Sequence, residues 1–397
     1  MLKRLIFRLL NLYRRLRLFF IRLRGKTPAD IHARRVVSGR VWDEFCDSLK
    51  AAGAALVFPG TPRDAFQQAE GYRYLTRLLR AGLENFIEYA DPAAPVLRRM
   101  VHETVKMGAD NPDNYYQNAK IDGQYTYRLR GRRNTVHYLG FGTQKGDYGR
   151  TGGLAPSGYL EGKDLHLDAD GGFEIILSTE PQPGNWLPMV PDTSLLIVRQ
   201  TFLNQAGEQL ATLHLECLDG NTQPALLSPQ SLDEGLSSVS ALVAGASLLF
   251  AKWARDFQQH SNQLPMFDPE VSNAAGGVAG ITYYHSHWCL AEDEALLIRA
   301  KPPFCDYWNF QLNNYWMESL DYRYFRIHIN KHTAVYAPDG SVQIVVAHQN
   351  PGLPNWIETV GHREGTMCFR WSNASETPTP QTQVLKFAEL SQLPNKI

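Results

Sequence analysis

The sequence predicts a mainly β protein with some α structure: two tandem β-sandwich modules from an internal duplication, a helical N-terminal segment and a bridging helix. Three observations predict this fold class. Short runs rich in β-branched and aromatic residues alternate with Gly, Asp and Pro, a set of motifs recurs after about 170 residues, and apolar residues elsewhere follow helical spacing. With 397 residues, 44% hydrophobic and 20% charged, the chain has the length and composition of a folded protein with more than one core.

Residues 1–26 are predicted to form a basic amphipathic helix that lies on a membrane surface. They carry nine Lys and Arg residues and no Asp or Glu, whereas residues 27–397 hold 31 basic and 40 acidic residues. The longest uncharged run, Leu9–Tyr13, is too short to span a bilayer. Apolar anchors flanked by basic residues favour an anionic membrane surface as the partner. Docking on the acidic body of the protein or on a partner protein is the alternative, and nucleic acid is the least favoured partner.

The cysteines indicate a reducing compartment. Their number, five, is odd, and no two are spaced as Cys-x-x-Cys, which disfavours a disulfide framework and a thiolate zinc site. Together with the basic N-terminal segment, this predicts a cytoplasmic protein held peripherally at the inner face of the membrane.

The other elements follow along the chain. Thr27 and Thr61 are each followed by a Pro and then an Asp, which is typical of a helix N-terminus. The uncharged stretch Gly235–Ala251 contains serines and glycines and is interpreted as a buried helix and not as a membrane span. The predicted parts are the surface helix 1–26, a helical segment 27–107, a first β-sandwich module 108–205, a linker 206–275 with a helix at 229–258, a second β-sandwich module 276–375, and a tail 376–397.

One motif occurs twice and carries the evidence for duplication. An Asn-Trp pair at 185–186 precedes Arg199, and a second pair at 355–356 precedes Arg370. An Asp-Gly turn and an apolar strand stand before each pair, so we predict that a whole module was duplicated. The Trp is interpreted mainly as a packing anchor and the Asn as a turn cap. A ligand contact is the alternative.

The second copy resembles a known bacterial family. The stretch Pro302–Trp316, the turn Pro338–Ser341, the Asn-Trp pair at 355–356 and Arg370 are similar to the domain of unknown function numbered 1214. The resemblance covers roughly residues 285–372, with a weaker echo over 115–205. It implies a paired all-β architecture and brings no established activity.

His285 and His287 are the sharpest candidates for chemistry. They are two residues apart on a predicted strand, so both point to one face. Together with Glu292 they are predicted as catalytic residues and as ligands of one divalent transition metal, in a partial resemblance to the first motif of cupins. The closing Gly and the second cupin motif are missing. Structural histidines, or a ligand-lining pair without metal, are the alternatives.

Aromatic residues concentrate around this strand, with twelve between Ile281 and Phe325. They predict an apolar pocket in the second module, and a sandwich core is the alternative. Asp306 is expected to pair with Arg370 or Arg299. The candidate ligand-binding residues are Tyr283, Trp288, Asp306, Trp308, Trp316, Trp356 and Arg370. The Gly-rich segment Gly140–Gly153 fits neither a dinucleotide fingerprint nor a phosphate loop, and we interpret it as a loop near a site.

The predicted function combines these features. We expect a membrane-surface-associated protein that binds or transforms a hydrophobic or lipid-linked small molecule in the aromatic pocket of the second module. An enzymatic role is favoured, although no reaction class follows from the motifs. The alternatives are a metal-dependent enzyme that uses the His-x-His site and a non-catalytic interaction scaffold.

Overall fold

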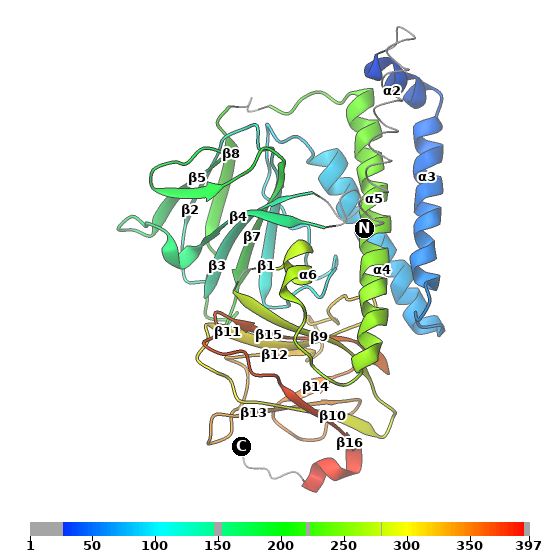
Figure 1. Cartoon of the computed structure of the whole chain (residues 1–397), viewed down its shortest axis with the longest axis vertical. Helices are drawn as coiled ribbons and strands as arrows, with labels where there is room; N and C mark the ends of the chain where they lie inside the picture. The colour runs from blue at the N-terminus through cyan, green and yellow to red at the C-terminus, as the bar shows by residue number, and fades with distance from the viewer. Residues whose placement is uncertain (1–26, 147–152, 220–222, 279, 393–397) are drawn as a thin grey trace.

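The computed structural model describes residues 27–146, 153–219, 223–278 and 280–392. The basic helix expected at 1–26 lies outside these residues and stays a prediction. Two β modules are stacked one on the other, and helices run along one side of both (Figure 1).

The helical segment begins as predicted and then departs in one detail. Thr27 caps the first helix in a reciprocal capping box with Asp30. Thr61 caps no helix, because its hydroxyl donates to the carbonyl of Leu56, and Asp64 caps the following helix instead. The helices are α2 (Pro28–Val37), α3 (Arg40–Ala52) and α4 (Ala65–Leu83), with a 3-10 turn at Gly53–Val57 and a π turn at Glu84–Glu88.

The first β module is a sandwich of two four-stranded sheets. Its strands are β1 (Asn114–Lys120), β2 (Tyr127–Arg132), β3 (Tyr138–Lys145), β4 (Ala155–Glu161), β5 (Gly172–Ser178), β6 (Asn185–Pro188), β7 (Thr193–Thr201) and β8 (Thr212–Cys217). One sheet has the order β1-β7-β3-β4 and the other β6-β5-β2-β8. Alternate residues of the two sheets, among them Phe141, Ile175 and Val198, meet in one apolar core.

The second β module repeats the first strand for strand. Its strands are β9 (Ile281–Cys289), β10 (Glu294–Ala300), β11 (Tyr307–Asn313), β12 (His328–Asn330), β13 (Val342–Ala347), β14 (Trp356–Glu358), β15 (Glu364–Ser372) and β16 (Gln381–Lys386). The sheet orders are β12-β11-β15-β9 and β14-β13-β10-β16, so β9 takes the place of β1 and β15 that of β7. The predicted fold class and duplication are confirmed.

Both modules extend further along the chain than the sequence predicts. β8 lies in the expected linker and β16 in the expected tail, yet each pairs with its module's second strand, β2 or β10. Each is an edge strand with one neighbour. Most side chains of β16 are exposed, so this strand lacks the apolar alternation that marks half-buried strands in a sequence.

The bridging helix is α5 (Pro229–Phe257), and the short helix α6 (Pro269–Ala274) follows it. By length and hydropathy α5 could cross a membrane, but half of its most apolar window is buried inside the protein. Val239 and Phe250 of α5 pack with α4 residues and with Trp316 of the second module in one core. This packing agrees with the interpretation of a buried helix.

The repeated Asn-Trp pairs make the same contacts in both modules. The Asn185 amide donates to the carbonyl of Glu174 on β5, and the Asn355 amide donates to that of Gln343 on β13, each at 3.0 Å. Each following Trp donates its indole N–H to a carbonyl at the end of the same neighbouring strand. In both copies the strand that carries the pair runs parallel to this neighbour. The pairs therefore hold equivalent strands in place, as the scaffold interpretation requires.

Candidate functional site

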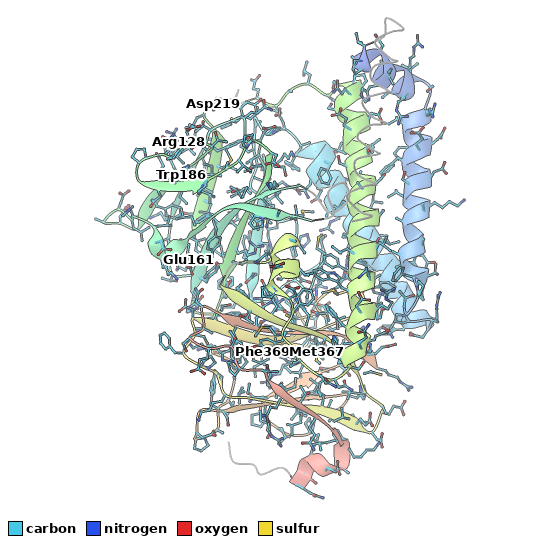
Figure 2. The ribbon with its side chains drawn as sticks, viewed as in Figure 1. Arg128, Glu161, Trp186, Asp219, Met367 and Phe369 are labelled. Atoms are coloured by element: carbon cyan, nitrogen blue, oxygen red, sulfur yellow. The ribbon has the colours of Figure 1, made fainter. Side chains whose placement is uncertain are left out.

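Two sheets, which we call the inner sheets, face the interior of the molecule: β1-β7-β3-β4 and β12-β11-β15-β9. Along β15, Met367 and Phe369 point into the sandwich core of the second module (Figure 2), while Cys368 and Arg370 point out of it. The same alternation on β7 turns Val198 to the core and Arg199 away from it. Each inner sheet therefore offers a second face that its own sandwich does not cover.

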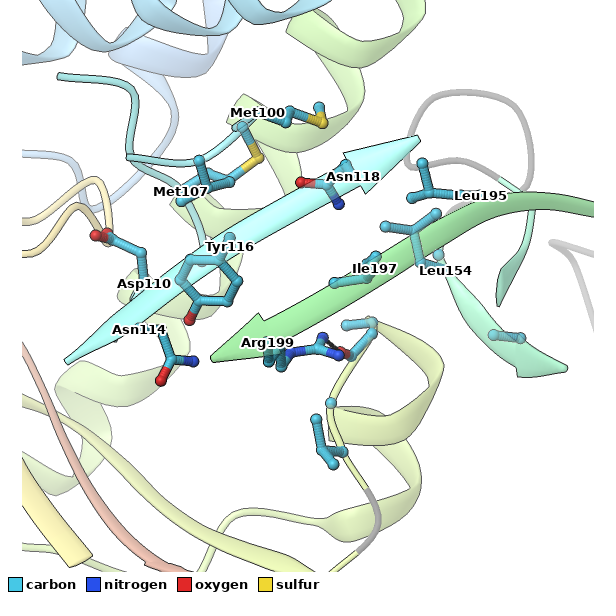
Figure 3. A pocket seen from close by; sticks show the side chains of 18 of the residues that line it. Met100, Met107, Asp110, Asn114, Tyr116, Asn118, Leu154, Leu195, Ile197 and Arg199 are labelled. Carbon is cyan, nitrogen blue, oxygen red and sulfur yellow. Dashed lines mark hydrogen bonds between the residues drawn. The ribbon is translucent and has the colours of Figure 1, made fainter. Parts of the chain in front are cut away.

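A cavity of about 1110 Å³ lies between these faces, α5 and the segment before β1. Both modules contribute to its wall. The apolar part of the wall includes Met100, Met107, Leu154, Leu195, Ile197, Leu242, Phe250 and Trp253. Figure 3 shows Arg199, Asn114 and Tyr116 together at one end of the β1–β7 pair, with Leu195 and Leu154 toward the other end.

The Gly-rich segment touches this cavity only in part. Its first half is strand β3, which corrects the interpretation of the whole segment as a loop. Gly146 and Gly153 line the cavity, and residues 147–152 lie outside the described part of the chain.

A Tyr–Arg pair occurs twice in the wall of the cavity. Strand register places Tyr116 of β1 opposite Arg199 of β7, and Tyr283 of β9 opposite Arg370 of β15. All four residues line the cavity. Because these strands are equivalent in the two modules, duplication brought two copies of one pair to a shared space.

Arg370 is a buried cation that neutral groups surround. Only 4% of the residue is exposed, and its guanidinium donates to Asn309 Oδ1 at 3.1 Å, to Gln311 Oε1 at 2.6 Å and to the carbonyl of Ala109. Three acceptors thus satisfy its hydrogen bonding without a carboxylate. A buried charge is costly unless such groups compensate it.

Arg199 sits at the equivalent position with far fewer partners. Among the described residues it makes one hydrogen bond, from Nη2 to the carbonyl of Gly276, at 2.8 Å. Where β11 places Asn309 and Gln311 beside Arg370, β3 places Gly140 and Gly142 beside Arg199. The side-chain amides that accept hydrogen bonds from Arg370 in the second module therefore have no counterpart beside Arg199 in the first module.

On the outer sheet of the first module, by contrast, arginines have acidic partners. Arg128, which Figure 2 labels, pairs with Glu216 at 2.7 Å, and Arg130 pairs with Glu174 at 2.9 Å. Among the ion pairs of the described residues, none involves Arg199 or Arg370. The two arginines in the cavity wall thus lack the carboxylate partners that these surface arginines have.

His285 lines the same cavity as a neutral ring. It stacks between Tyr283 and Phe257, with ring centroids 5.6 and 5.7 Å away, and burial lowers its pKa to about 3. Its Nε2 lies 3.9 Å from the Cys368 thiol, whose pKa burial raises to about 11. Both groups are uncharged at neutral pH, so they do not form the thiolate–imidazolium pair of a cysteine nucleophile.

The structure does not bring the three predicted metal ligands together. His287 contacts Glu364, with Nε2 3.1 Å from the carboxylate, and its Nδ1 lies 2.9 Å from the Ser261 hydroxyl. Glu292 is largely exposed and pairs with Arg363. Among the described residues, no group of three or more His, Cys, Asp and Glu could hold a metal ion. The two histidines share a strand face as predicted, but the turn after β9 carries Glu292 away from them.

The predicted tryptophans lie in cores and not at the cavity. Trp288 and Trp308 are fully buried inside the second sandwich, and Trp316 packs in the helical core with its indole N–H bonded to the carbonyl of Gln67. Trp356 holds β14 to β13 as described above. The aromatic concentration thus mainly reflects packing, which was the alternative interpretation.

Three predicted ligand-binding residues do reach the cavity: Tyr283, Asp306 and Arg370. Asp306 accepts a hydrogen bond from Asn373 at 2.8 Å and is not paired with Arg370 or Arg299. The cavity wall also contains residues that the sequence did not predict as ligand-binding: Tyr116, Asn118, Met100 and Met107. A strand-by-strand alignment of the two copies would have found Tyr116, because it matches Tyr283, but nothing local marks the two methionines.

The comparisons with known proteins agree with this fold. The family described as protein of unknown function (DUF1214) matches residues 155–202 and 294–376. A solved structure of an uncharacterized protein from Burkholderia cenocepacia is 48% identical, with a TM-score of 0.88 over 90% of this chain and 99% of that one. The VPA0106 protein from Vibrio parahaemolyticus is 10% identical, with a TM-score of 0.47 over 80% of this chain and 98% of that one. Among the curated proteins, none matches. The chain belongs to the DUF1214 family, whose model matches more of the second module than of the first.

Proposed function

We propose that this protein binds a hydrophobic or amphipathic small molecule in the cavity between its two β modules. The observation that carries the proposal is the cavity itself, with its volume of about 1110 Å³ and its largely apolar wall. Ligand pockets in proteins are of comparable size and combine apolar walls with a few polar groups. The proposal keeps the class of ligand that the sequence predicts, but it moves the site to the boundary between the modules.

Two orphan polar atoms in the cavity wall support a ligand with polar groups. Asn118 Oδ1 and His285 Nδ1 are buried and have no hydrogen-bond partner among the described residues. Both residues line the cavity. A buried polar atom without a partner costs about 1–3 kcal/mol, which a ligand atom or an ordered water molecule would recover.

The wall is also suited to a flexible apolar chain. Met100 and Met107 stand on one side of β1, and Leu195 and Ile197 precede Arg199 at alternate positions of β7 (Figure 3). Methionine side chains adapt to ligands of irregular shape, because they are unbranched and polarizable. Binding, and not catalysis, is the activity that this wall supports best.

A membrane is the proposed source of the ligand. Residues 1–26 have the basic and apolar pattern of a segment that binds anionic lipid surfaces. Removal of residues 2–24 should therefore release the full chain from phosphatidylglycerol vesicles in a flotation assay, while ligand binding persists. If the shortened chain still floats with the vesicles, another surface carries the membrane contact.

Native mass spectrometry of the full-length protein tests the binding proposal, with Nile red as a neutral fluorescent probe of the cavity. Ser238 of α5 lines the cavity, whereas its neighbour Ser237 is exposed to solvent. Ser238→Trp should fill part of the cavity and weaken Nile red binding at least tenfold, and the matched control Ser237→Trp should not. Equal binding by both variants, with no copurified mass on the wild type, would refute the proposal.

A further inference from the structure

We infer that the cavity holds the anionic head group of an amphipathic ligand, a carboxylate or a phosphate on an apolar chain, against Arg199 and the tyrosine hydroxyls of the duplicated pairs. The inference rests on the proposed function, because it assigns a charge to the ligand of that same site.

The two copies of the Tyr–Arg pair differ in the hydrogen-bond acceptors around the arginine. A guanidinium has five N–H donors. The second copy supplies Arg370 with three acceptors, two of which are the side-chain amides of Asn309 and Gln311. The first copy has glycines at the corresponding positions of β3, and Arg199 donates only to the carbonyl of Gly276. Most donors of Arg199 thus have no acceptor among the described residues.

One of these glycines, Gly142, also leaves room beside this guanidinium. A Cβ atom placed on Gly142 would lie 3.8 Å from Arg199 Nη1, in ordinary van der Waals contact. The space that the Gln311 side chain occupies in the second module is therefore open in the first, whereas the Tyr138 ring fills the place of Asn309, because a Cβ on Gly140 would lie 2.5 Å from the Tyr138 hydroxyl.

The neighbouring polar groups at this end are also donors. The Tyr116 hydroxyl accepts a hydrogen bond from the backbone N–H of Asn111 at 3.0 Å, which leaves its own proton to donate. Asn114 Oδ1 accepts from the side chain of Asn111, so the Asn114 amide N–H groups remain as donors. Tyr283 lines the cavity, and its hydroxyl has no hydrogen-bond partner among the described residues. Donors in excess of acceptors are what an oxyanion requires.

The charges near this end are positive. The Arg370 guanidinium carbon lies 5.7 Å from the centre of the Tyr283 ring. Burial raises the pKa of the Tyr283 hydroxyl, and the charges that act on it come from Arg370 and Arg199, which oppose that rise. A fixed anion beside Tyr283 would therefore meet two cations in a setting of low polarity, where charge–charge attraction is strong.

The acidic residues that line the cavity have partners of their own. Asp110 accepts from the backbone and the hydroxyl of Ser319, and its burial raises its pKa, which favours the neutral acid. Asp192 lies 3.8 Å from Lys145, and Asp306 accepts from Asn373. Glu234 is exposed. None of these carboxylates forms an ion pair with Arg199.

From Arg199, the apolar chain of the ligand can run along one strand, β7. Arg199, Ile197 and Leu195 occupy alternate positions of β7 on the cavity face. They span roughly 13 Å of strand, since a strand rises about 3.3 Å per residue. A ligand with its anion at Arg199 can therefore lay a medium-length alkyl chain along β7.

A series of ten-carbon probes with different head groups tests the inference on the full-length protein. Decanoate, decyl phosphate, decanol and decyltrimethylammonium compete with Nile red near neutral pH. A charge-assisted hydrogen bond should make decanoate or decyl phosphate bind roughly tenfold to a hundredfold more tightly than decanol, with the ammonium weakest. The stronger of the two anions indicates a fatty acid or a phosphorylated lipid as the natural source.

Variants then place the charge. Arg199→Met should abolish the preference for anions, so that decanoate binds no more tightly than decanol, and Arg199→Lys should restore part of the preference. Arg130→Met removes a surface arginine of the outer sheet and is the matched control. The inference is overturned if wild type binds decanol as tightly as the anions, or if Arg199→Met keeps the preference. If Nile red does not bind in the cavity at all, the proposed function itself fails, whereas Nile red binding that no anionic probe displaces overturns the inference alone. The probe series on the wild type decides the question even if the Arg199 variants do not fold.

Discussion

Asn355→Ala tests whether the repeated Asn-Trp pair is a structural element. Asn355 is 1% exposed, and its side chain makes three hydrogen bonds to backbone groups. Oδ1 accepts from the N–H of Val335 at 2.9 Å, and the amide donates to the carbonyls of Val335 and Gln343 at 2.7 and 3.0 Å. Alanine would remove all three and leave one N–H and two carbonyls without these partners.

The expected loss of stability follows from these contacts. A buried group left without its partner costs about 1–3 kcal/mol, and carbonyls suffer less than N–H groups because they have a second lone pair. We therefore expect Asn355→Ala to lower the free energy of unfolding by roughly 3–5 kcal/mol, which is at the upper end for single substitutions. The matched control is Asn350→Ala. Asn350 is exposed and its side chain accepts one hydrogen bond within a turn, so its loss should cost less than about 1 kcal/mol.

Urea unfolding followed by tryptophan fluorescence measures the difference, and thermal unfolding should show a fall in Tm on the order of 10 °C. Asn185→Ala should behave like Asn355→Ala, because Asn185 makes the same three kinds of contact. An Asn355 variant within about 1 kcal/mol of the Asn350 control would refute the scaffold role and return the pair to the ligand-contact alternative.

Three further outcomes are expected. The hydrogen bond to His287 lowers the pKa of Glu364 below its ordinary value of 4.5. This contact therefore stabilises the fold above pH 4.5, and the stabilisation is lost as the pH falls through the folded pKa. Glu364→Gln should lower Tm at neutral pH, and the difference in Tm from wild type should vanish in acid. A Cβ on Gly71 would lie 2.8 Å from the Trp316 ring, so Gly71→Ala should lower the free energy of unfolding in urea by about 1–3 kcal/mol. Gly53 has open space around it, so the control Gly53→Ala should leave the free energy of unfolding unchanged or raise it. Because the described residues offer no cluster of three metal ligands, elemental analysis should find no stoichiometric transition metal. His287→Ala should leave the metal content unchanged. One bound metal per chain that disappears in this variant would contradict the geometry.

The candidate site shows where inference from sequence stops. Tyr283 and Arg370 were predicted as ligand-binding residues, and both reach the cavity. Successive side chains of a strand point to opposite faces of the sheet, and these two lie on the face that the cavity meets. Trp288 and Trp308 were predicted with them, but they point to the opposite face of the same sheet and fill the sandwich core. Local composition placed aromatic residues on these strands without deciding which sheet face is turned to a cavity. That decision depends on what packs against each face.

By itself, the sequence determined the elements of this protein. Strand texture, the bridging helix and the paired Asn-Trp motifs depend on contacts within one module, and duplication made them visible twice. Only the tertiary structure decided that Arg199 and Arg370 share a cavity and that His285 is a neutral buried ring. These outcomes arise where two modules and α5 meet. Contacts between residues so far apart in the chain have no periodicity or spacing of their own, so packing between modules leaves no local signal in the sequence.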